Sequence, residues 1–424
     1  MTQSASPADP AVQGSLVVVG LGYIGLPTAA MFASTGIDVT GVDINPRAVE
    51  AVNAGTAHIE EGELDELVER CVAASRLRAR TTPVPADNFI IAVPTPVGHD
   101  ENHSPDVGYV RAAGEAIAPC LKKGDLVILE STSPVGTTRM LAELLAEARP
   151  DLSFPHQAGD ECDVCLAYCP ERIIPGQMLK ELVENDRIIG GMTARCSEQA
   201  SALYRSFVRG TCHITDDRTA EMVKLTENAS RDVSIAFANE LSMICSDLEL
   251  DAWQVIELAN RHPRVNILNP GPGVGGHCIA VDPWFIIASA PERAKLIRTT
   301  REINNGKTDF VVGQIEKAME EMPGTKVACL GLTYKPDVDD FRESPAFAIA
   351  STLSKRHDGR VLASDPYADA LPEKVRRDAG LTMVPAEEAL AEAGIIVLLV
   401  GHTAFRAFPN PQGKVILDTV GFWR

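Results

Sequence analysis

Hydrophobic residues near the N-terminus form two short runs separated by a glycine turn and a small-residue segment. The first run, 16–19, is rich in β-branched side chains, and Gly-Leu-Gly-Tyr-Ile-Gly follows it at 20–25. Small and apolar residues then fill 26–34, and a second run at 39–43 ends in an acid. This pattern predicts a buried strand, a tight turn, a helix that packs on a sheet, and a second strand parallel to the first.

Similar aliphatic runs recur along the chain, and the earlier ones stop at polar or proline-containing loops. They lie at 89–93, 126–129 and 164–168 in the first half and at 327–330, 360–363, 395–400 and 415–418 near the C-terminus. Between the two sets, 219–248 contains neither proline nor glycine and predicts one long helix, and 291–318 predicts another. We therefore predict an α/β fold, in which two Rossmann-like doubly wound domains are joined by a central helical region with a long helix.

The length of the chain sets the expected number of domains. With 424 residues, two or three domains are expected. We expect a disordered tail at 1–13, a first Rossmann-like domain at 14–215, a central helical and dimerisation domain at 216–320, and a second Rossmann-like domain at 321–424. Small residues at 236–239 allow close helix packing, so the long helix is expected to form the surface of a homodimer.

The overall composition excludes several classes of protein. The chain has 39 basic and 58 acidic side chains, and this net charge of −19 argues against a nucleic-acid-binding surface. A local basic pocket for an anionic substrate is still compatible with it. The N-terminal residues lack the pattern of a secretory signal, and the longest aliphatic run, 395–400, is too short to span a bilayer. Ten cysteines are too sparse for a disulfide scaffold, so we expect a cytoplasmic protein with reduced thiols and no membrane partner.

Three closely spaced cysteines raise the question of a metal site. Cys162, Cys165 and Cys169 form a CxxCxxxC cluster. No second CxxC pair or nearby pair of histidines completes four ligands. We therefore prefer ordinary thiols to a structural metal here.

The first glycine turn has the full context of a dinucleotide-binding fingerprint. Gly20 permits the tight turn, Gly22 lets the backbone approach a pyrophosphate, and Gly25 lets the helix and strand pack closely. Asp43 follows at the end of the second strand, where it would accept hydrogen bonds from ribose hydroxyls and repel the 2′-phosphate of NADP. The sequence thus favours NAD, the alternative being a fold element that has lost its ligand.

A second glycine-rich loop ends in a cysteine. Residues 271–276 read Gly-Pro-Gly-Val-Gly-Gly, Cys278 follows, and Asp282 lies four residues later. Glycine removes the side chains that would hold a ligand away, although a packed small hydrophobe is the commoner fate of a cysteine. Beside a nucleotide cofactor, an accessible thiol indicates oxidation of a carbonyl to an acid through a thioester. Asp282 is either a turn residue before Pro283 or a carboxylate that orients a water or an alcohol.

Two polar residues on the long predicted helix fit the same chemistry. Lys224 and Asn228 lie four residues apart and so share a face, which by itself indicates a solvated helix surface. Thiol chemistry on a carbonyl needs nearby hydrogen-bond donors, and an ammonium and an amide could stabilise an oxyanion as charge develops. We therefore include both in the candidate site.

Taken together, these motifs resemble the UDP-glucose/GDP-mannose dehydrogenase family over nearly the whole chain, from Leu16 to Arg424. As a set they are highly specific. They are GLGYIGLPTA from 20, VPTP at 93–96, ESTSPVGTT at 130–138, CPER at 169–172, KLTENASRD at 224–232, GPGVGGHCIAVDP at 271–283 and RESP at 342–345.

The resemblance implies an NAD-dependent four-electron oxidation of a sugar C6 alcohol to a uronate. Cys278 would form a thiohemiacetal and then a thioester, and water would hydrolyse the thioester. The version of the motif after Arg172 resembles the acetamido-sugar branch, which implies UDP-N-acetyl-D-mannosamine as substrate and cell-surface polysaccharide synthesis as its use. UDP-N-acetylglucosamine and UDP-glucose remain alternatives, as does a nucleotide-binding regulator that has lost catalysis.

The resemblance also assigns residues to each role, with no metal. The catalytic set is Cys278, Lys224, Asn228, Asp282, Thr132 and Glu171. The NAD set is Gly20, Gly22, Tyr23, Ile24, Gly25, Asp43, Arg47, Thr95, Thr132 and Arg342. The UDP-sugar set is Glu171, Arg172, Lys224, Asn228, Arg264, Gly275 and Lys335. Two positions depart from the family: Pro175 replaces a second glutamate, and Val420 replaces a basic residue near the uridine or sugar.

Overall fold

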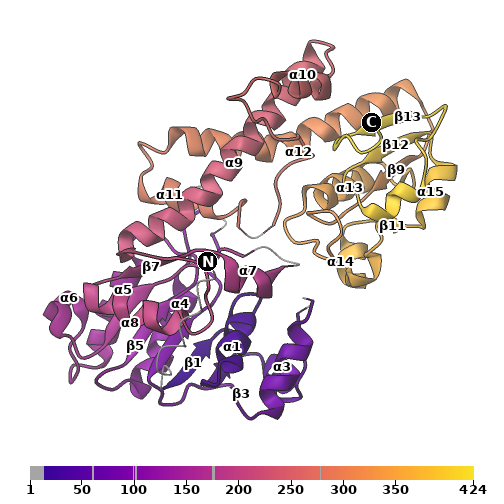
Figure 1. The fold of residues 1–424 in the computed structure, drawn as a ribbon. Coiled ribbons are helices and arrows are strands. Elements are labelled where there is room, and N and C mark those ends of the chain that lie inside the picture. Colours follow the sequence, from indigo (N-terminus) through magenta and orange to yellow (C-terminus); the bar gives the residue numbers. More distant parts are fainter. Residues whose placement is uncertain (1–13, 60–61, 99, 101–102, 174–176, 277) are drawn as a thin grey trace, which may run out of the picture. The chain divides into compact units, whose positions relative to one another are not determined.

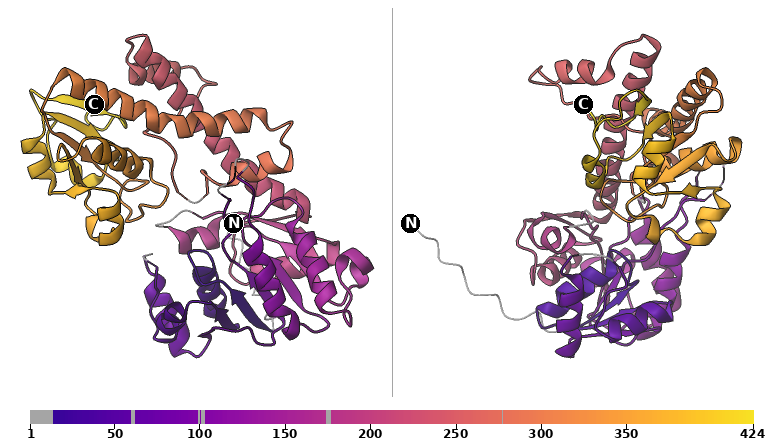
Figure 2. Two further views of the ribbon diagram at one scale, coloured as in Figure 1. Left: turned by 180° about the vertical axis from the view of Figure 1, so that it is seen from behind. Right: turned by 90° about the vertical axis from the view of Figure 1, so that its right-hand side faces the viewer.

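The computed structural model describes residues 14–424 apart from 60–61, 99, 101–102, 174–176 and 277, and the chain divides into two compact units, 1–226 and 227–424 (Figure 1; Figure 2). The expected tail at 1–13 lies outside the described residues. Each unit has its own sheet and its own hydrophobic cores. No helix in the described part of the chain combines the length and apolar character needed to cross a membrane.

The first unit is built on an eight-stranded sheet. Its strands are β1 (Ser15–Val19), β2 (Asp38–Val42), β3 (Leu77–Arg80), β4 (Asn88–Ile91), β5 (Leu126–Leu129), β6 (Cys165–Tyr168), β7 (Arg187–Gly191) and β8 (Cys212–Asp216). The order is β3-β2-β1-β4-β5-β6-β7-β8, and only the β6–β7 pair is antiparallel. The order reverses between β1 and β4, which is the place where doubly wound sheets bind ligands.

Helices cover both faces of this sheet. They are α1 (Gly25–Ser34), α2 (Pro46–Asn53), α3 (Leu64–Ala73), α4 (Gly108–Ile117), α5 (Thr137–Ala148), α6 (Pro155–Ala158), α7 (Met178–Glu184) and α8 (Ala194–Tyr204). Alternate residues of β1 enter different cores: Leu16 and Val18 join one cluster, and Val17 and Val19 the other. Burial on both faces explains the continuous apolar run of this strand.

The second unit repeats the parallel architecture on a smaller scale. Its strands β9 (Val327–Leu330), β10 (Val361–Ser364), β11 (Thr382–Met383), β12 (Ile395–Leu398) and β13 (Val415–Asp418) are all parallel, in the order β11-β10-β9-β12-β13. Its helices are α10 (Ala252–Ala259), α11 (Asp282–Ser289), α12 (Lys295–Glu321), α13 (Pro345–Arg356), α14 (Glu373–Asp378) and α15 (Ala386–Glu392). The 31-residue α9 (Asp217–Asp247) begins in the first unit and ends in the second.

The predicted fold class is confirmed, and two details differ from the sequence analysis. The expected helices at 219–248 and 291–318 are α9 and α12, each shifted by a few residues. Strands β3, β7, β8 and β11 were not predicted. In β3 buried and exposed residues alternate, β7 ends in two glycines, β8 is largely exposed, and β11 has only two residues. The boundaries proposed for three domains remain predictions. The structure divides into two compact units, and the division between residues 226 and 227 falls within α9.

Candidate active site

The glycine turn after β1 has the backbone geometry of a dinucleotide loop. Gly20 has a φ of +93°, and a Cβ there would lie 2.4 Å from the carbonyl oxygen of Ala92. A Cβ on Gly25 would lie 1.8 Å from the carbonyl oxygen of Gly20, so only glycine fits at this crossing of helix and strand. At Gly22 a Cβ would meet nothing within 4 Å. This open position at the mouth of the turn fits a bound pyrophosphate.

The start of α1 and the side chain of Asp43 complete the fit to NAD. No side chain caps the N-terminus of α1 and its first turn has no acidic residue, so its N–H groups can receive a phosphate. The Asp43 carboxylate accepts the N–H of Leu21 at 2.9 Å and that of Asn45 at 2.8 Å. These bonds fix it beside the turn and leave lone pairs for ribose hydroxyls.

The remaining NAD residues predicted in this unit lie close to the same edge of the sheet. Tyr23 and Arg47 are exposed and Ile24 is half-buried. Thr95 and Thr132 follow β4 and β5, and the Thr95 hydroxyl donates to the carbonyl oxygen of Thr132 at 2.5 Å. This hydrogen bond joins the loops at the carboxyl ends of two neighbouring strands.

Glu171 lies in a buried ion-pair network that the sequence analysis did not predict. One of its oxygens accepts from the guanidinium of Arg187 at 2.5 Å and the other from the N–H of Arg172 at 2.7 Å. Arg187 also donates to Glu130 at 3.2 Å. β7 runs antiparallel to β6, with Tyr168 paired to Gly190. Continued past the end of β6, this register brings Arg187, the first residue of β7, opposite Glu171. The sequence offers no local signal for this contact.

The same network perturbs the protonation of Glu130. Its oxygens also accept from the hydroxyls of Tyr204 at 3.0 Å and Thr28 at 3.2 Å. The pKa of Glu130 is raised to about 7, with burial as the largest cause; Arg187 opposes this rise, and the charge of Glu171 contributes to it. One arginine therefore neutralises two closely placed carboxyls.

Helix α9 carries Lys224 and Asn228 on one face, one turn apart. Lys224 is 9% exposed, and the Asn228 amide donates to Asp282 Oδ2 at 2.5 Å. The structure thus brings together two of the predicted catalytic residues from α9 and α11. One turn before Lys224, the carboxylate of Glu221 accepts the N–H groups of Gly136 at 2.5 Å and Thr138 at 2.8 Å, which fixes the start of α9.

Cys278 is the one exposed cysteine among the ten. It lies in the turn before α11, where its carbonyl oxygen accepts the N–H of Val281 at 3.1 Å and that of Asp282 at 2.8 Å. Asp282 itself is buried. The turn therefore couples an accessible thiol to the carboxylate that holds Asn228. The neighbouring His277 lies outside the described residues.

A buried polar network, also missed from the sequence, anchors the cysteine loop at both ends. The N–H of Gly271 donates to Asn239 at 2.9 Å, and Asn239 donates to Asn304 at 2.9 Å. Arg301 donates to Asp232 at 2.7 Å and to the carbonyl oxygen of Ile279 at 3.5 Å. Asp232 lies in the motif at 224–232, but nothing in the sequence pairs it with Arg301, 69 residues away.

The segment that bears Lys335 and Arg342 packs against the cysteine loop. A Cβ on Gly275 would lie 2.4 Å from the carbonyl oxygen of Glu343, and one on Gly276 would lie 3.0 Å from the ring of Tyr334. Glycine at both positions is required for this approach. Lys335 is exposed, and Arg342 forms a bidentate pair with Asp340 at 2.7 and 2.8 Å.

The remaining predicted site residues have more varied surroundings. Arg264 is exposed in the loop after α10, and Arg172 donates to the carbonyl oxygen of Asp186 at 3.0 Å. Val420 packs against an apolar cluster of the second unit, so a substrate-facing role has no support there. Pro175 lies outside the described residues.

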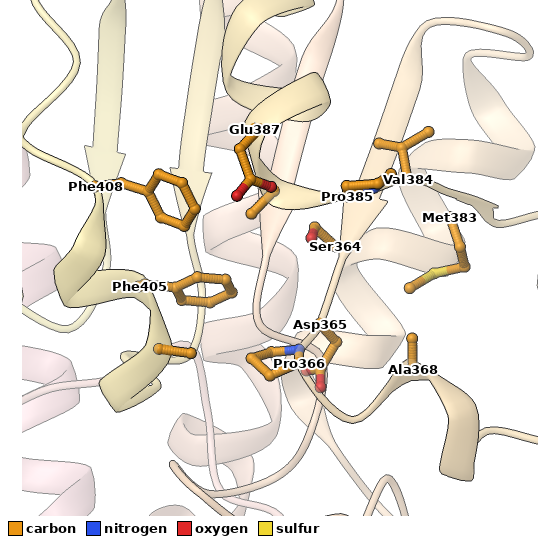
Figure 3. Close-up of a pocket in the computed structure, with 12 residues that line it drawn as sticks. Ser364, Asp365, Pro366, Ala368, Met383, Val384, Pro385, Glu387, Phe405 and Phe408 are labelled. Carbon is orange, nitrogen blue, oxygen red and sulfur yellow. The ribbon is translucent and has the colours of Figure 1, made fainter.

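A surface pocket of about 380 Å³ lies at the carboxyl end of β10 (Figure 3). Phe405, Phe408 and Pro385 make its wall mostly apolar, and its two acids are Asp365 and Glu387. No lysine or arginine lines it, so the pocket suits an apolar or planar group better than a diphosphate. Asp365 lies next to a second glycine turn, where it accepts the N–H of Leu332 at 2.6 Å.

Comparison with known proteins agrees with this geometry. Three models of the UDP-glucose/GDP-mannose dehydrogenase family match the chain in succession. They are the NAD binding domain at residues 15–208, the central domain at 218–306 and the UDP binding domain at 328–424.

Relatives of similar length also match. An NDP-N-acetyl-D-galactosaminuronic acid dehydrogenase of Ralstonia nicotianae is 56% identical over 411 residues, which is 96% of each chain. A UDP-N-acetyl-D-mannosamine dehydrogenase of Escherichia coli K12 is 53% identical over 421 residues, 97% of this chain and 99% of that one. The native structure of a UDP-N-acetyl-mannosamine dehydrogenase from Staphylococcus aureus has a TM-score of 0.84 at 44% identity, with 96% of this chain and 95% of that one covered.

Proposed function

The chain belongs to the UDP-glucose/GDP-mannose dehydrogenase family, and from that premise we propose that it oxidises the C6 alcohol of UDP-N-acetyl-D-mannosamine to the uronate. As a member of this family it is an NAD-dependent nucleotide-sugar dehydrogenase. The exposed thiol of Cys278, held one turn from the Asp282–Asn228 pair, is the observation that carries the proposed chemistry.

The reaction removes four electrons in two oxidations of the same carbon. NAD, when bound, accepts one hydride in each oxidation. The C6 alcohol loses a hydride and its hydroxyl proton to give the aldehyde. The thiolate of Cys278 then adds to the aldehyde carbon and forms a thiohemiacetal, whose oxidation gives a thioester. Water cleaves the carbon–sulfur bond of the thioester, which releases the carboxylate and restores the thiol.

The other residues assigned to catalysis have complementary tasks in this scheme. Lys224 supplies an ammonium and Asn228 an amide N–H, and both stabilise the negative oxygen that develops on C6. Asp282 orients the Asn228 amide through their 2.5 Å hydrogen bond and accepts a proton from the alcohol or the attacking water. Thr132 and Glu171 belong to the first unit, where Glu171 is already neutralised by Arg187. We assign Glu171 the task of positioning the loop at 169–172.

Residues of the two units are also assigned to the ligands. Gly20, Gly22 and Gly25 with Asp43 hold NAD, and Lys335 and Arg342 contribute positive charge for the UDP-sugar and cofactor. The pairing of Arg342 with Asp340 means that its guanidinium is pre-oriented but partly neutralised. The overall acidity of the chain makes these local cations important for binding a diphosphate.

A second substrate has specific support. The 56% identical relative from Ralstonia nicotianae is named for an N-acetyl-D-galactosaminuronic acid nucleotide, whereas the 53% identical Escherichia coli relative is named for the manno sugar. Both sugars carry a 2-acetamido group. They are stereoisomers that differ in the configuration of ring carbons bearing the acetamido group and a hydroxyl. UDP-N-acetylgalactosamine is therefore the second candidate.

Turnover of purified nucleotide sugars, compared side by side, tests the proposal. We expect kcat/KM to be highest for UDP-N-acetylmannosamine, measured as NADH absorbance, with UDP-N-acetylgalactosamine, UDP-N-acetylglucosamine and UDP-glucose as competitors. Preference for the galacto sugar would select the second candidate. Absence of NADH with all four sugars would reject both and support a binding regulator.

A further inference from the structure

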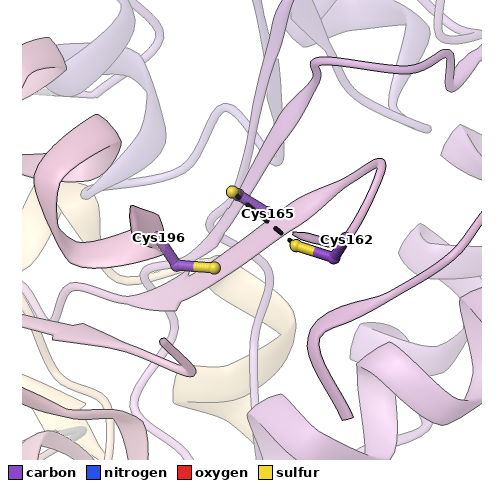
Figure 4. Close-up of side chains that lie close together, drawn as sticks. All are labelled: Cys162, Cys165 and Cys196. Atoms are coloured by element: carbon purple, nitrogen blue, oxygen red, sulfur yellow. Dashed lines mark hydrogen bonds between the residues drawn. The ribbon is translucent and has the colours of Figure 1, made fainter. Parts of the chain in front are cut away.

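Three cysteine sulfurs of the first unit converge in its interior (Figure 4). The sulfur atoms of Cys162, Cys165 and Cys196 all lie within 4.8 Å of one another, and those of Cys162 and Cys165 are 4.0 Å apart. All three residues are at most 2% exposed. They come from the loop before β6, the first residue of β6 and the first turn of α8. Nothing in the proposed oxidation uses them.

The geometry points to a binding site for a thiophilic d10 metal ion, which we propose as a new site of this protein. Thiolate sulfur selects soft ions such as Cu(I), Zn(II) and Cd(II). With a metal–sulfur distance of about 2.3 Å, sulfurs around one ion lie about 3.8–4.0 Å apart. The Cys162–Cys165 separation of 4.0 Å already matches this value. The other separations need to close by less than about 1 Å.

The third sulfur of the group belongs to Cys196, whereas the spacing in the sequence grouped Cys169 with Cys162 and Cys165. Cys169 follows Cys165 by four residues along an extended segment, which separates the two by about 13 Å. Cys196 replaces it, because α8 packs against β6 and delivers its first turn to the beginning of that strand. No histidine or carboxylate of the described residues joins the group, so the site offers three sulfurs and favours trigonal coordination.

The surroundings support thiolate at this position. Cys196 lies in the first turn of α8, where the helix dipole is positive, and the hydroxyl of Thr193 donates to its sulfur at 3.2 Å. Arg195 is held over the cluster by donating to the carbonyl oxygen of Cys162 at 2.8 Å. The helix N-terminus, the Thr193 hydroxyl and the nearby guanidinium all favour negative charge on the sulfurs.

Binding is a simple exchange of protons for metal. Each thiol releases its proton to solvent as its sulfur–metal bond forms, and no electron is transferred. The bound ion ties β6 to the start of α8. Because β6 leads into Glu171, and α8 follows the strand that begins with Arg187, the ion would brace the two segments that carry this ion pair.

Spectroscopic titration with Cd²⁺ tests the site. The exposed thiol is first removed by Cys278→Ala, and the anaerobic, reduced protein is equilibrated with Cd²⁺ while the ultraviolet sulfur-to-metal charge-transfer band is followed. We expect one ion per chain, release of thiol protons, and a higher thermal midpoint of unfolding, because the ion binds only the native arrangement. Adding Cys196→Ala should weaken binding by at least roughly 100-fold.

Cys329→Ala in the same background is the matched control, since this cysteine is equally buried but lies in β9. It should leave the titration unchanged. Should Cys196→Ala perturb folding, Cys162→Ala provides the same comparison from the loop side. The proposal is overturned if no charge-transfer band develops, or if the band is equally strong in the Cys162 and Cys196 variants.

Discussion

The ten cysteines of the chain differ chiefly in their exposure, and this difference separates their chemistry. Seven are buried, Cys120 and Cys212 are half-buried, and Cys278 is exposed. Burial raises the pKa of Cys329 to about 12, so that thiol stays protonated at neutral pH. A thiol that reacts with a sugar aldehyde must be accessible, and Cys278 meets that condition.

Replacement of the nucleophile should separate the two oxidations. In Cys278→Ser the hydroxyl lacks an activating base, so overall conversion to the uronate should fall by at least roughly 10³-fold. The first hydride transfer should remain measurable in a single turnover. Cys120→Ser serves as the control and should keep wild-type turnover. Wild-type-like uronate formation by Cys278→Ser would contradict the role of this sulfur.

At the scale of elements, α9 and α12 hold the cysteine loop through buried charge. Asp232 of α9 and Arg301 of α12 are 0% and 2% exposed in their side chains, and burial raises the pKa of Asp232 even though Arg301 lowers it. Removing one member of such a pair leaves the other charge buried without a partner. The position of the loop therefore depends on a contact between two long helices.

This dependence can be measured by unfolding the second unit, which contains all three tryptophans of the chain. Arg301→Met should lower the free energy of unfolding by about 3–5 kcal/mol in urea, followed by tryptophan fluorescence. Combination with Asp232→Asn should cost less than the sum of the two single changes. Arg356→Met removes a surface pair with Glu316 and should cost about 1 kcal/mol or less. Equal effects of Arg301→Met and Arg356→Met would contradict the account.

The packing of α12 against α9 also places a lysine in an apolar setting. Burial lowers the pKa of Lys307 to about 8, and its ammonium donates to the hydroxyl of Ser242 at 2.8 Å. Between pH 8 and 10.5 the unfolded chain holds a proton that the folded chain has lost. Stability should therefore rise with pH in this window, by about 1.4 kcal/mol per pH unit.

The difference between wild type and Lys307→Met isolates this contribution. Urea titrations at pH 7 to 10 should show the wild type gaining stability relative to the variant above pH 8. Lys317→Met, at an exposed position of the same helix, should show no such trend. A difference that stays constant across the range would show that Lys307 has an ordinary pKa.

Local sequence patterns predicted most of the helices and strands near the site, but they did not predict the contacts between residues far apart in the sequence. The turn at Gly20 and its pairing with Asp43 follow from one strand–helix–strand unit, so the sequence was sufficient. Arg187 was missed because its role depends on the antiparallel return of β7, which no adjacent residue signals. Cys196 was missed for a similar reason, since strand spacing suggests Cys169 and only the packing of α8 selects Cys196. The sequence analysis placed Asn228 and Asp282 in the same site but did not predict the hydrogen bond between them.

At the scale of the whole molecule, the two units share one structural device. In the first, Gly20 has a positive φ and Asp43 accepts the N–H of Leu21. In the second, Gly331 has a φ of +82°, and Asp365 accepts the N–H of Leu332. Both turns follow the first strand of a sheet at its point of reversal, where nucleotides bind. The chain thus carries two nucleotide-type folds, as a reaction between a dinucleotide and a nucleotide sugar requires.

The homodimer remains a prediction, and exposed apolar side chains on α9 offer a surface on which to test it. Phe237 and Ile244 are 55% and 48% exposed, and their spacing of seven residues places them on one face of the helix. Leu248, directly after the end of α9, is 62% exposed. We propose that a second copy covers this face. Phe237→Glu should give a monomer in light scattering, whereas Arg231→Gln, at an exposed position on another face of α9, should leave the dimer intact. A wild-type monomer would refute the proposal.

The central claim is that one enzyme carries the C6 carbon through both oxidations by way of the sulfur of Cys278. The most direct measurement is the amount of NADH formed per UDP-N-acetylmannosamine consumed, with the uronate quantified in the same reaction. Our account predicts two NADH for every sugar and one uronate. One NADH per sugar, with the aldehyde released as product, would contradict it.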